Sequence, residues 1–523
     1  MDRERAAQMR PEDGKMNTRG RRGFLKGSAA AMAALWAHNS GVLSALAEPE
    51  TKPRPNIVLI LSDDVGYGDL GCYGARLPRT PHIDGLAQKG RRFTDAHSDS
   101  SVCTPSRYAI LSGMYAWRRR DAQILPGDAA LLFADRQVTL PRLLQQAGYA
   151  TGCVGKWHLG LGRGAIDWNG EIEPGPREVG FDESFILPAT ADRVPCVYVE
   201  NGRVVGLDPK DPIHVSYKKL VGDDPTGSDA PYLLKMKLSE GHDGTIVDGV
   251  SRIGFMSGGK KARWVDEEMA ATLAGKATAF IDKHHAQPFF LYLATSDIHV
   301  PRMPNGKFAD HSRCGVRCDV IEQLDWTVGQ VLDTLERHKL MENTLVLFTS
   351  DNGPVVDDGY ADGSVENLNG HTPSGKLRGG KYSLYEGGTR VPFIAYWKGQ
   401  IPAGVSSAVL SQTDMLATLA AVAGVDVPHA TDFDSQNLRA VLMGVSEQGR
   451  TTLVEADAVQ RTAIREGRWK LLDLTRPGSA TQGKRELYDL EADPGETRDV
   501  AAENPAVAER LMALLNRIRA RNN

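Results

Sequence analysis

The stretch Ile57-Val-Leu-Ile-Leu-Ser-Asp-Asp64 is a run of five apolar residues that ends in a polar cluster. Four more apolar runs follow it in the chain, at 150–154, 289–294, 345–348 and 392–397. Continuous apolar runs of this length predict strands that are buried on both faces, as in a parallel sheet. Helical patterns lie between the runs, at 140–147, 266–284 and 319–340. The alternation predicts an α/β fold, with a large mixed, mostly parallel sheet covered by helices on both faces.

Four of these runs end in polar clusters with reactive side chains. The clusters contain Asp63 and Asp64, then Lys156 and His158, then His299, then Asp351 and Asn352. The carboxyl ends of parallel strands meet at one edge of a sheet, and ligands bind at that edge. The sequence therefore predicts a functional site there.

Three carboxylates and one amide oxygen come from Asp63, Asp64, Asp351 and Asn352. Such a set of hard oxygen ligands suits Ca²⁺ or Mg²⁺ and disfavours Zn²⁺. Either pair alone could equally consist of solvated loop residues or helix caps. Two pairs, both at strand ends, favour a metal site.

A second motif is Cys103-Thr-Pro-Ser-Arg107, followed by Leu111-Ser-Gly113. Its first part is also compatible with an ordinary helix start, with Pro105 in the first turn. The whole motif resembles the signature of type I sulfatases, a family of the alkaline phosphatase superfamily. In that family a maturase oxidises the Cys to Cα-formylglycine (3-oxoalanine), an aldehyde that becomes the nucleophile. The resemblance runs from about Asn56 to Asp499.

The resemblance implies a role for each matching residue. The calcium ligands of the family match Asp63, Asp64, Asp351 and Asn352, and the formylglycine made from Cys103 completes the set. Mg²⁺ is the alternative ion.

The other matching positions imply the catalytic groups. Lys156 and Lys381 match the lysines that bind sulfate, and Arg107 matches the residue that pairs with the formylglycine hydroxyl. His158 matches the base that deprotonates the hemiacetal, and His299 matches the acid that protonates the leaving alkoxide.

The chemistry implied is the release of inorganic sulfate from a sulfate ester. One hydroxyl of the formylglycine hydrate attacks sulfur and forms a covalent sulfo-enzyme. The second hydroxyl then loses its proton, and sulfate leaves by C–O cleavage. Two alternatives stay open: a formylglycine-dependent phosphonate or phosphodiester hydrolase, and an inactive protein that binds sulfated glycans. The Cys at position 103 and the complete set of matching residues favour the sulfatase.

The substrate predicted is a sulfated molecule, with carbohydrate sulfates favoured. The stretch from Pro188 to Asn201 resembles branches of the family that cleave 6-O-sulfated hexosamine or galactose residues. Trp168, Arg193 and Tyr198 could line a sugar pocket or pack the loop.

Residues 1–47 predict an export signal. Arg21-Arg22-Gly-Phe-Leu-Lys26 is a twin-arginine pattern, and an apolar segment from Gly27 to about Leu46 precedes the small residues of Ala45-Leu-Ala47. The segment is too short and too mildly apolar for a membrane span, and a disordered tail is the alternative interpretation. A twin-arginine (Tat) signal implies the Tat translocase as a partner and a periplasmic or secreted protein. The net charge of −4 gives no indication of nucleic-acid binding.

The rest of the chain divides at changes in pattern. We expect a catalytic domain over 48–448, with a loop-rich insertion at about 164–264, and an α+β subdomain over 449–523. In that subdomain, 451–455, 461–464 and 469–472 predict short strands, and 503–519 predicts a helix. Cys314 and Cys318 could form a late disulfide or be two buried thiols.

Overall fold

The computed structural model describes residues 54–429, 432–481 and 483–521. The predicted export signal, 1–47, lies outside the described residues. Within the described part of the chain, no helix is long and apolar enough to cross a membrane.

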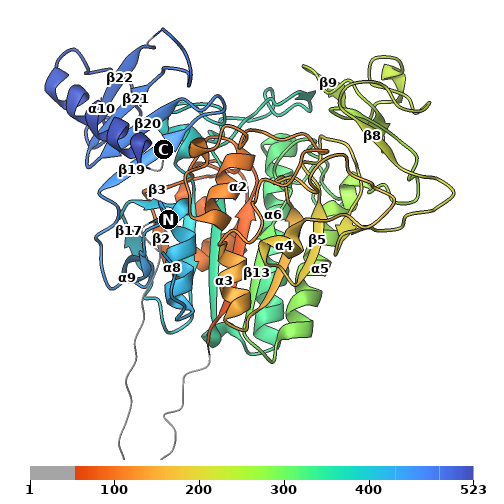
Figure 1. The fold of residues 1–523 in the computed structure, drawn as a ribbon, viewed down its shortest axis with the longest axis horizontal. Coiled ribbons are helices and arrows are strands. Elements are labelled where there is room, and N and C mark those ends of the chain that lie inside the picture. Colours follow the sequence, from red (N-terminus) through yellow and green to blue (C-terminus); the bar gives the residue numbers. More distant parts are fainter. Residues whose placement is uncertain (1–53, 430–431, 482, 522–523) are drawn as a thin grey trace, which may run out of the picture. The chain divides into compact units, whose positions relative to one another are not determined.

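A ten-stranded sheet forms the centre of the molecule (Figure 1). Its strands follow the order β17-β2-β16-β14-β1-β13-β4-β5-β6-β7. The five strands from β14 to β5 run parallel, whereas β16 and β6 pair antiparallel with their neighbours. The bounds are β1 Asn56–Ser62, β2 Arg91–Phe93, β4 Ala150–Lys156, β5 Glu183–Leu187, β6 Val199–Glu200, β7 Arg203–Val204, β13 Phe289–Ala294, β14 Thr344–Ser350, β16 Phe393–Tyr396 and β17 Gly404–Ser406.

The predicted buried strands are confirmed. Every residue of β1, β4, β13 and β14 is buried. In the register of the sheet, Leu59 lies between Tyr292 of β13 and Leu347 of β14. The run at 392–397 also forms a buried strand, β16, and this strand is antiparallel to β14. Its apolar sequence indicates burial and carries no information on direction.

Two groups of helices cover this sheet. Helices α1 (Pro81–Lys89), α5 (Met269–His284) and α6 (Gly315–Arg337) form one group, in which α6 contacts both others. The second group consists of α2 (Cys103–Ser112), α3 (Leu140–Gln146) and α8 (Met415–Val422), all three in mutual contact. The shorter helices are α4 Pro176–Val179, α7 Glu386–Thr389 and α9 Arg439–Leu442.

The three long helical patterns are confirmed, with shifted ends. Asp266–Glu268 forms a 3-10 turn before α5, and α6 begins at Gly315 rather than at 319. Cys314 and Cys318 form a disulfide at the start of α6. Cys72, Cys103, Cys153 and Cys196 are free thiols.

The region 164–264 contains short strands and loops, as expected. Strand β5, however, extends the central sheet beside β4, which the sequence analysis did not predict. The other short strands of the molecule pair in twos: β3 Ala96–His97 with β18 Leu410–Ser411, β8 His214–Ser216 with β12 Phe255–Ser257, β9 Lys237–Leu238 with β15 Tyr360–Ala361, and β10 Ile246–Val247 with β11 Val250–Ser251.

The C-terminal residues form a four-stranded antiparallel sheet with one helix. Its strands are β19 Thr452–Ala456, β20 Thr462–Glu466, β21 Trp469–Asp473 and β22 Arg485–Asp489. Helix α10 (Pro505–Ala520) packs on β20 and β21 through Leu511 and Leu515. The first three strands and the helix are confirmed. The fourth strand, β22, was not predicted.

Candidate active site

The structure brings the predicted residues together at the carboxyl edge of the parallel strands. Asp63 and Asp64 follow β1, and Asp351 and Asn352 follow β14. His158 follows β4, whose last residue is Lys156, and His299 follows β13. Strands β14, β1, β13 and β4 are consecutive neighbours, so the parallel order itself gathers these side chains.

Each acid at this edge is paired with a different base. Lys156 Nζ donates to both carboxylate oxygens of Asp63, at 2.8 and 2.7 Å. Arg107 donates twice to Oδ2 of Asp351, from Nε at 3.0 Å and from Nη2 at 2.8 Å. Lys381 Nζ donates to Oδ2 of Asp64 at 2.8 Å. All six side chains are buried. Their burial is tolerated because each carboxylate compensates one cation.

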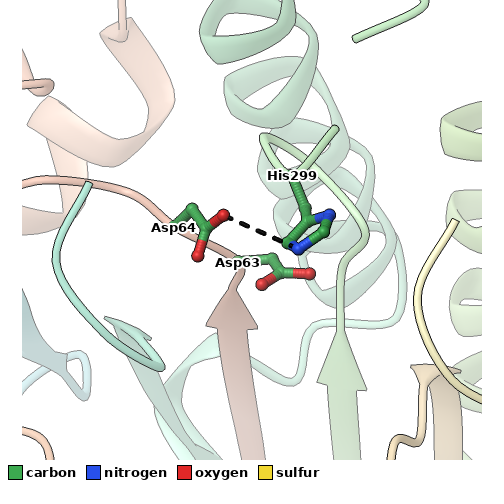
Figure 2. A group of neighbouring side chains, drawn as sticks. All are labelled: Asp63, Asp64 and His299. Carbon is green, nitrogen blue, oxygen red and sulfur yellow. Dashed lines mark ion pairs between the residues drawn. The ribbon is translucent and has the colours of Figure 1, made fainter. Parts of the chain in front are cut away.

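The side-chain oxygen of Asn352 fits the role of a cation ligand. Its Nδ2 donates to Oδ1 of Asp64 at 2.7 Å, while its Oδ1 is buried and accepts no hydrogen bond among the described residues. Buried amide oxygens are nearly always paired. Ligand atoms of Asp63, Asp64 and His299 also lie within 4.8 Å of one another (Figure 2). The residues present therefore fit a hard divalent cation.

The electrostatics of the acids support the same interpretation. Burial, together with the charges of Asp351 and Asp64, raises the pKa of Asp63 well above its ordinary value, although Lys156 and Arg107 oppose the rise. Burial would also raise the pKa of Asp64, but Lys381 and Lys156 lower it. A bound cation would favour the charged form of both.

Three residues at this edge have a strained backbone. Asp64, His158 and Tyr382 have φ angles of 62°, 53° and 74°, in the left-handed region. A non-glycine residue held there costs about 1–2 kcal/mol. The packed surroundings maintain these conformations, which aim side chains into the site.

The turn that carries Asp351 and Asn352 packs tightly on the segment after Lys381. The amide of Gly353 donates to the carbonyl of Gly388 at 2.8 Å. A Cβ on Gly353 would lie 1.8 Å from the carbonyl oxygen of Gly387. This close approach requires glycine at position 353 and links the metal-ligand turn to the Lys381 segment.

Cys103 is the first residue of α2 and is 2% exposed. Its Sγ lies 3.2 Å from Nδ1 of His158, whose Nε2 lies 2.8 Å from the carbonyl oxygen of Leu125. A carbonyl can only accept, so Nε2 carries the proton. Burial, with Lys156 and Arg193, lowers the pKa of His158 well below its ordinary value, so the ring is neutral. Nδ1 is then an acceptor aimed at position 103.

The unmodified thiol of Cys103 is a poor nucleophile in this environment. Burial raises its pKa, despite the opposing charges of Lys156 and Lys381. The thiolate, and not the thiol, attacks electrophiles. The encoded thiol is therefore mostly protonated and is not poised to act as a nucleophile.

His299 also lies beside the acid cluster. Its Nδ1 lies 2.7 Å from the carbonyl oxygen of Val300, so Nδ1 donates and Nε2 points into the site. Nε2 lies 3.8 Å from Oδ2 of Asp64, the ion pair drawn in Figure 2, and 3.9 Å from Oδ2 of Asp358. Burial, with Lys381 and Lys156, lowers its pKa well below the ordinary value.

Asp358 is a site residue that the sequence analysis missed. Lys381 Nζ donates to its Oδ2 at 2.9 Å, and the hydroxyl of Tyr382 donates to its Oδ1 at 2.7 Å. Asp358 lies in a loop, outside any strand or motif. Arg302 and Arg317 hold this loop by donating to the carbonyl of Val355, at 2.9 and 2.8 Å.

Asp192, Arg193 and His242 form a charged group near the Cys103–His158 pair, and of these residues only Arg193 was considered from the sequence. Asp192 accepts from Arg193 Nη1 at 2.9 Å and pairs with His242 Nε2 at 3.0 Å. The charge of Asp192 acts on His299, and that of Arg193 acts on His158. Of the residues considered for a sugar pocket, Arg193 belongs to this group. Tyr198 instead stacks on Phe185, and Trp168 is buried in the core.

Comparison with known proteins agrees with the fold and the site. The Sulfatase family model matches residues 55–425, and a model of the C-terminal region of N-sulphoglucosamine sulphohydrolase matches 380–522. An N-acetylgalactosamine-6-O-sulfatase of Bacteroides thetaiotaomicron is 48% identical over 482 residues, covering 90% of this chain and 94% of the relative. Human arylsulfatase A is 32% identical over 489 residues, covering 88% of this chain and 87% of the relative.

Solved structures show the same likeness. One, from work on glycosaminoglycan metabolism by Bacteroides thetaiotaomicron, has a TM-score of 0.87 and 48% identity, covering 90% of this chain and 100% of that chain. Another, crystallised with k-i-k-neocarrahexaose, has a TM-score of 0.65 and 25% identity, covering 90% of this chain and 94% of that chain. Sheet, site and relatives together define an enzyme of the alkaline phosphatase superfamily. The chain belongs to the sulfatase family, and it is a sulfatase.

Proposed function

We propose that this sulfatase releases inorganic sulfate from carbohydrate sulfates, with a formylglycine made from Cys103 by a maturase and with Ca²⁺ at the acid cluster. The observation that carries the proposal is the buried contact of Cys103 with the unprotonated Nδ1 of a neutral His158. A base is in place beside a thiol that is itself unreactive. An aldehyde hydrate at position 103 would give this base a hydroxyl proton to accept.

The cation would be held by oxygens of Asp63, Asp64, Asp351 and Asn352, with position 103 completing the set. When bound, a divalent cation polarises a sulfate ester and lowers the pKa of an adjacent hydroxyl. All-oxygen ligation favours Ca²⁺, with Mg²⁺ as the alternative.

Each side chain around this centre has a separate proposed role in the reaction. His158 Nδ1 accepts the hydroxyl proton at position 103. Lys156 and Lys381 place positive charge where the sulfate oxygens lie, in a buried site where such charges act strongly. His299 presents Nε2 to the leaving oxygen. Because the proton of the neutral ring lies on Nδ1, Nε2 must first take up a second proton, which the negative charge of a bound sulfate ester would favour, and His299 then passes that proton to the leaving oxygen. Arg107 fixes Asp351 and, through Nη1 at 3.0 Å, the carbonyl of Lys156.

A carbohydrate substrate is supported by the relatives and by the polar rim of the site. The relative with 48% identity is an N-acetylgalactosamine-6-O-sulfatase. Asp192, Arg193 and His242 offer charged donors and acceptors close to Cys103 and His299, the chemistry that sugar hydroxyl groups require. We infer an environmental sulfated glycan, because the chain begins with a predicted twin-arginine signal and is proposed to work in the periplasm or outside the cell.

The burial of Cys103 also supports a sequence of oxidation first, then folding, then export. A side chain that is 2% exposed is inaccessible to a maturase in the folded protein. Twin-arginine export carries folded proteins. Oxidation of Cys103 is therefore proposed to occur in the cytosol, before folding and export.

The test is mass spectrometry of the peptide containing Cys103, together with sulfate release from defined sulfated mono- and disaccharides. The expected result is the aldehyde in protein made with a maturase, and release from at least one 6-O-sulfated sugar. An unmodified thiol in fully active enzyme would refute the formylglycine. Faster turnover of a phosphonate or phosphodiester than of every sulfated sugar would favour the alternative hydrolase.

A further inference from the structure

A cavity of about 490 Å³ lies between the segment after α2 and the C-terminal sheet. Trp117 and Arg120 line it from the first side, and Gln460, Asp473 and Arg476 line it from the second. Arg519 of α10 completes the wall. None of these residues belongs to the site described above.

The lining of this cavity carries unbalanced positive charge. It contains three arginines, Arg120, Arg476 and Arg519, and one acid, Asp473, so its formal charge is 3 − 1 = +2. Arg519 Nη2 donates to Oδ2 of Asp473 at 2.9 Å, which leaves that acid occupied. Within the described residues, Arg120 and Arg476 have no ion pair. The cavity is therefore lined by two exposed guanidinium groups that have no acidic partner among the described residues.

Trp117 forms part of the same wall through its ring. Its indole Nε1 is buried and has no acceptor in the described part of the chain. The ring is fixed by Tyr115, with centroids 5.5 Å apart, and by the guanidinium of Arg118, at 4.6 Å from the ring. The guanidinium groups of Arg120 and Arg476 lie in the same lining, and an anionic ligand would complement them.

The cavity is connected to the active site by short stretches of chain. Gln460 Nε2 donates to the carbonyl of Arg119 at 2.7 Å, and the guanidinium of Arg119 lies 5.5 Å from the ring of Tyr108. Tyr108 follows Cys103 on α2 by five residues, about 7.5 Å along the helix axis.

A second connection runs along the chain from Arg120. Leu125, whose carbonyl accepts from His158, is five residues further on and hence within about 17 Å of Arg120. The two sites are therefore close enough for a single oligosaccharide to occupy both.

We propose that this cavity, lined by Arg120, Arg476 and Arg519, binds a sulfate or carboxylate group of the same glycan whose terminal sulfated sugar occupies the active site. The inference rests on the proposed carbohydrate substrate. Arginine matches both anions, because its planar fork can donate two parallel hydrogen bonds to them. The enzyme would thereby favour anionic chains over isolated sulfated sugars.

The test compares substrates of two lengths in the full-length, maturase-treated enzyme. The double variant Arg120→Glu, Arg476→Glu should raise KM for a sulfated hexasaccharide about ten-fold, with kcat unchanged. It should leave KM and kcat for 4-nitrophenyl sulfate and for a sulfated monosaccharide unchanged. The matched control is Arg517→Glu, an exposed arginine of α10 that does not line the cavity, and it should change none of these values.

The results distinguish the proposal for the cavity from the proposal of a carbohydrate substrate. An unchanged KM for the hexasaccharide in the double variant would overturn the cavity proposal and leave the carbohydrate substrate standing. An equal rise for all three substrates would also overturn it, because the arginines would then act on the active site itself. Cleavage of the aryl sulfate without cleavage of any sulfated sugar by the wild type would overturn the carbohydrate substrate.

Discussion

Two buried clusters of charge in this molecule have the same formal composition and different chemistry. The active-site cluster contains Asp63, Asp64, Asp351 and Asp358 with Lys156, Lys381 and Arg107. The interface cluster joins the C-terminal sheet to the rest of the chain and contains Asp95, Glu386, Glu455 and Glu496 with Arg390, Arg465 and Lys470. Each has four acids and three bases, hence a formal charge of 3 − 4 = −1.

The two clusters differ in the protonation state of their histidines, and this determines whether the formal charge of −1 is neutralised within the chain. In the interface cluster His97 lies between Asp95, at 2.8 Å, and Glu455, at 2.9 Å. Burial would lower its pKa, but Glu386 and Glu455 raise it to about 8, so His97 supplies the missing positive charge. In the active-site cluster His158 and His299 are held neutral. That cluster is left with a formal negative charge, which burial opposes by raising the pKa of Asp63, and with an unpaired amide oxygen, so its residues fit a cation from outside the chain.

The largest expected effect is a loss of activity without a loss of stability, on substitution of Cys103. Cys103→Ala should lower kcat/KM for a sulfate ester on the order of 10³-fold or more, because it removes the nucleophile and the group that His158 faces. The thermal midpoint should stay close to that of the wild type, since no ion pair is lost. Activity assays and calorimetry on the same preparation check both. Cys153→Ala, a buried free thiol in β4, is the control and should retain activity. Retained activity in Cys103→Ala would remove the basis for the proposed mechanism.

In the interface cluster, by contrast, we expect a substitution to lower the stability of the protein. Lys470 contacts Glu386 at 2.8 Å, Glu496 at 3.2 Å and Glu455 at 3.7 Å, and it is fully buried. Lys470→Met leaves these acids without their shared cation and should lower the free energy of unfolding by about 3–5 kcal/mol. Urea denaturation measures the change.

Lys484→Met provides the matched control for this prediction. Lys484 is exposed and pairs with Glu486 at the surface of the same sheet. Its loss should cost less than about 1 kcal/mol. Equal losses in the two variants would show that the buried cluster does not stabilise the interface.

The sequence predicts the active-site cluster better than the interface cluster, for a physical reason. Asp63 and Asp351 directly follow apolar runs, and parallel pairing brings the ends of such runs together. Asp358 has no such signal, because Arg302 and Arg317 place its loop through contacts made at the tertiary level. The same holds for Lys470, an ordinary strand residue by pattern, whose partners lie on segments far apart in the chain. The direction of β16 was likewise not predictable from its composition.

Metal removal should affect one cluster and leave the other intact. Dialysis against a calcium chelator should abolish sulfate release. It should also lower the free energy of unfolding, by about 2.7 kcal/mol relative to protein at a Ca²⁺ concentration of one hundred times Kd. The variant Asn352→Ala removes the unpaired amide oxygen and should show a smaller shift. A thermal midpoint that does not respond to Ca²⁺ in the wild type would contradict the metal site.

The smallest effect is a pH dependence that comes from the interface cluster. The pKa of His97 rises from 6.5 to about 8 on folding, so the folded state binds its proton more tightly than the unfolded state. The resulting stabilisation is fully present below pH 6.5 and is lost as the pH rises through 8. It amounts to at most about 2 kcal/mol. Burial raises the pKa of Glu496 to about 7, which acts in the same direction.

Urea denaturation of the calcium-loaded enzyme at pH 6 and pH 8.5 measures this difference. The free energy of unfolding should be lower at pH 8.5. The variant His97→Gln should be less stable than the wild type at pH 6 and should lose less stability between the two pH values, because only Glu496 still contributes. Chelation should lower the free energy of unfolding of the wild type at both pH values. The difference between the two pH values should remain, because the proton of His97 and the cation of the active site balance charge in separate clusters. Equal stability of the wild type at the two pH values would mean that His97 is not the group that neutralises the interface cluster.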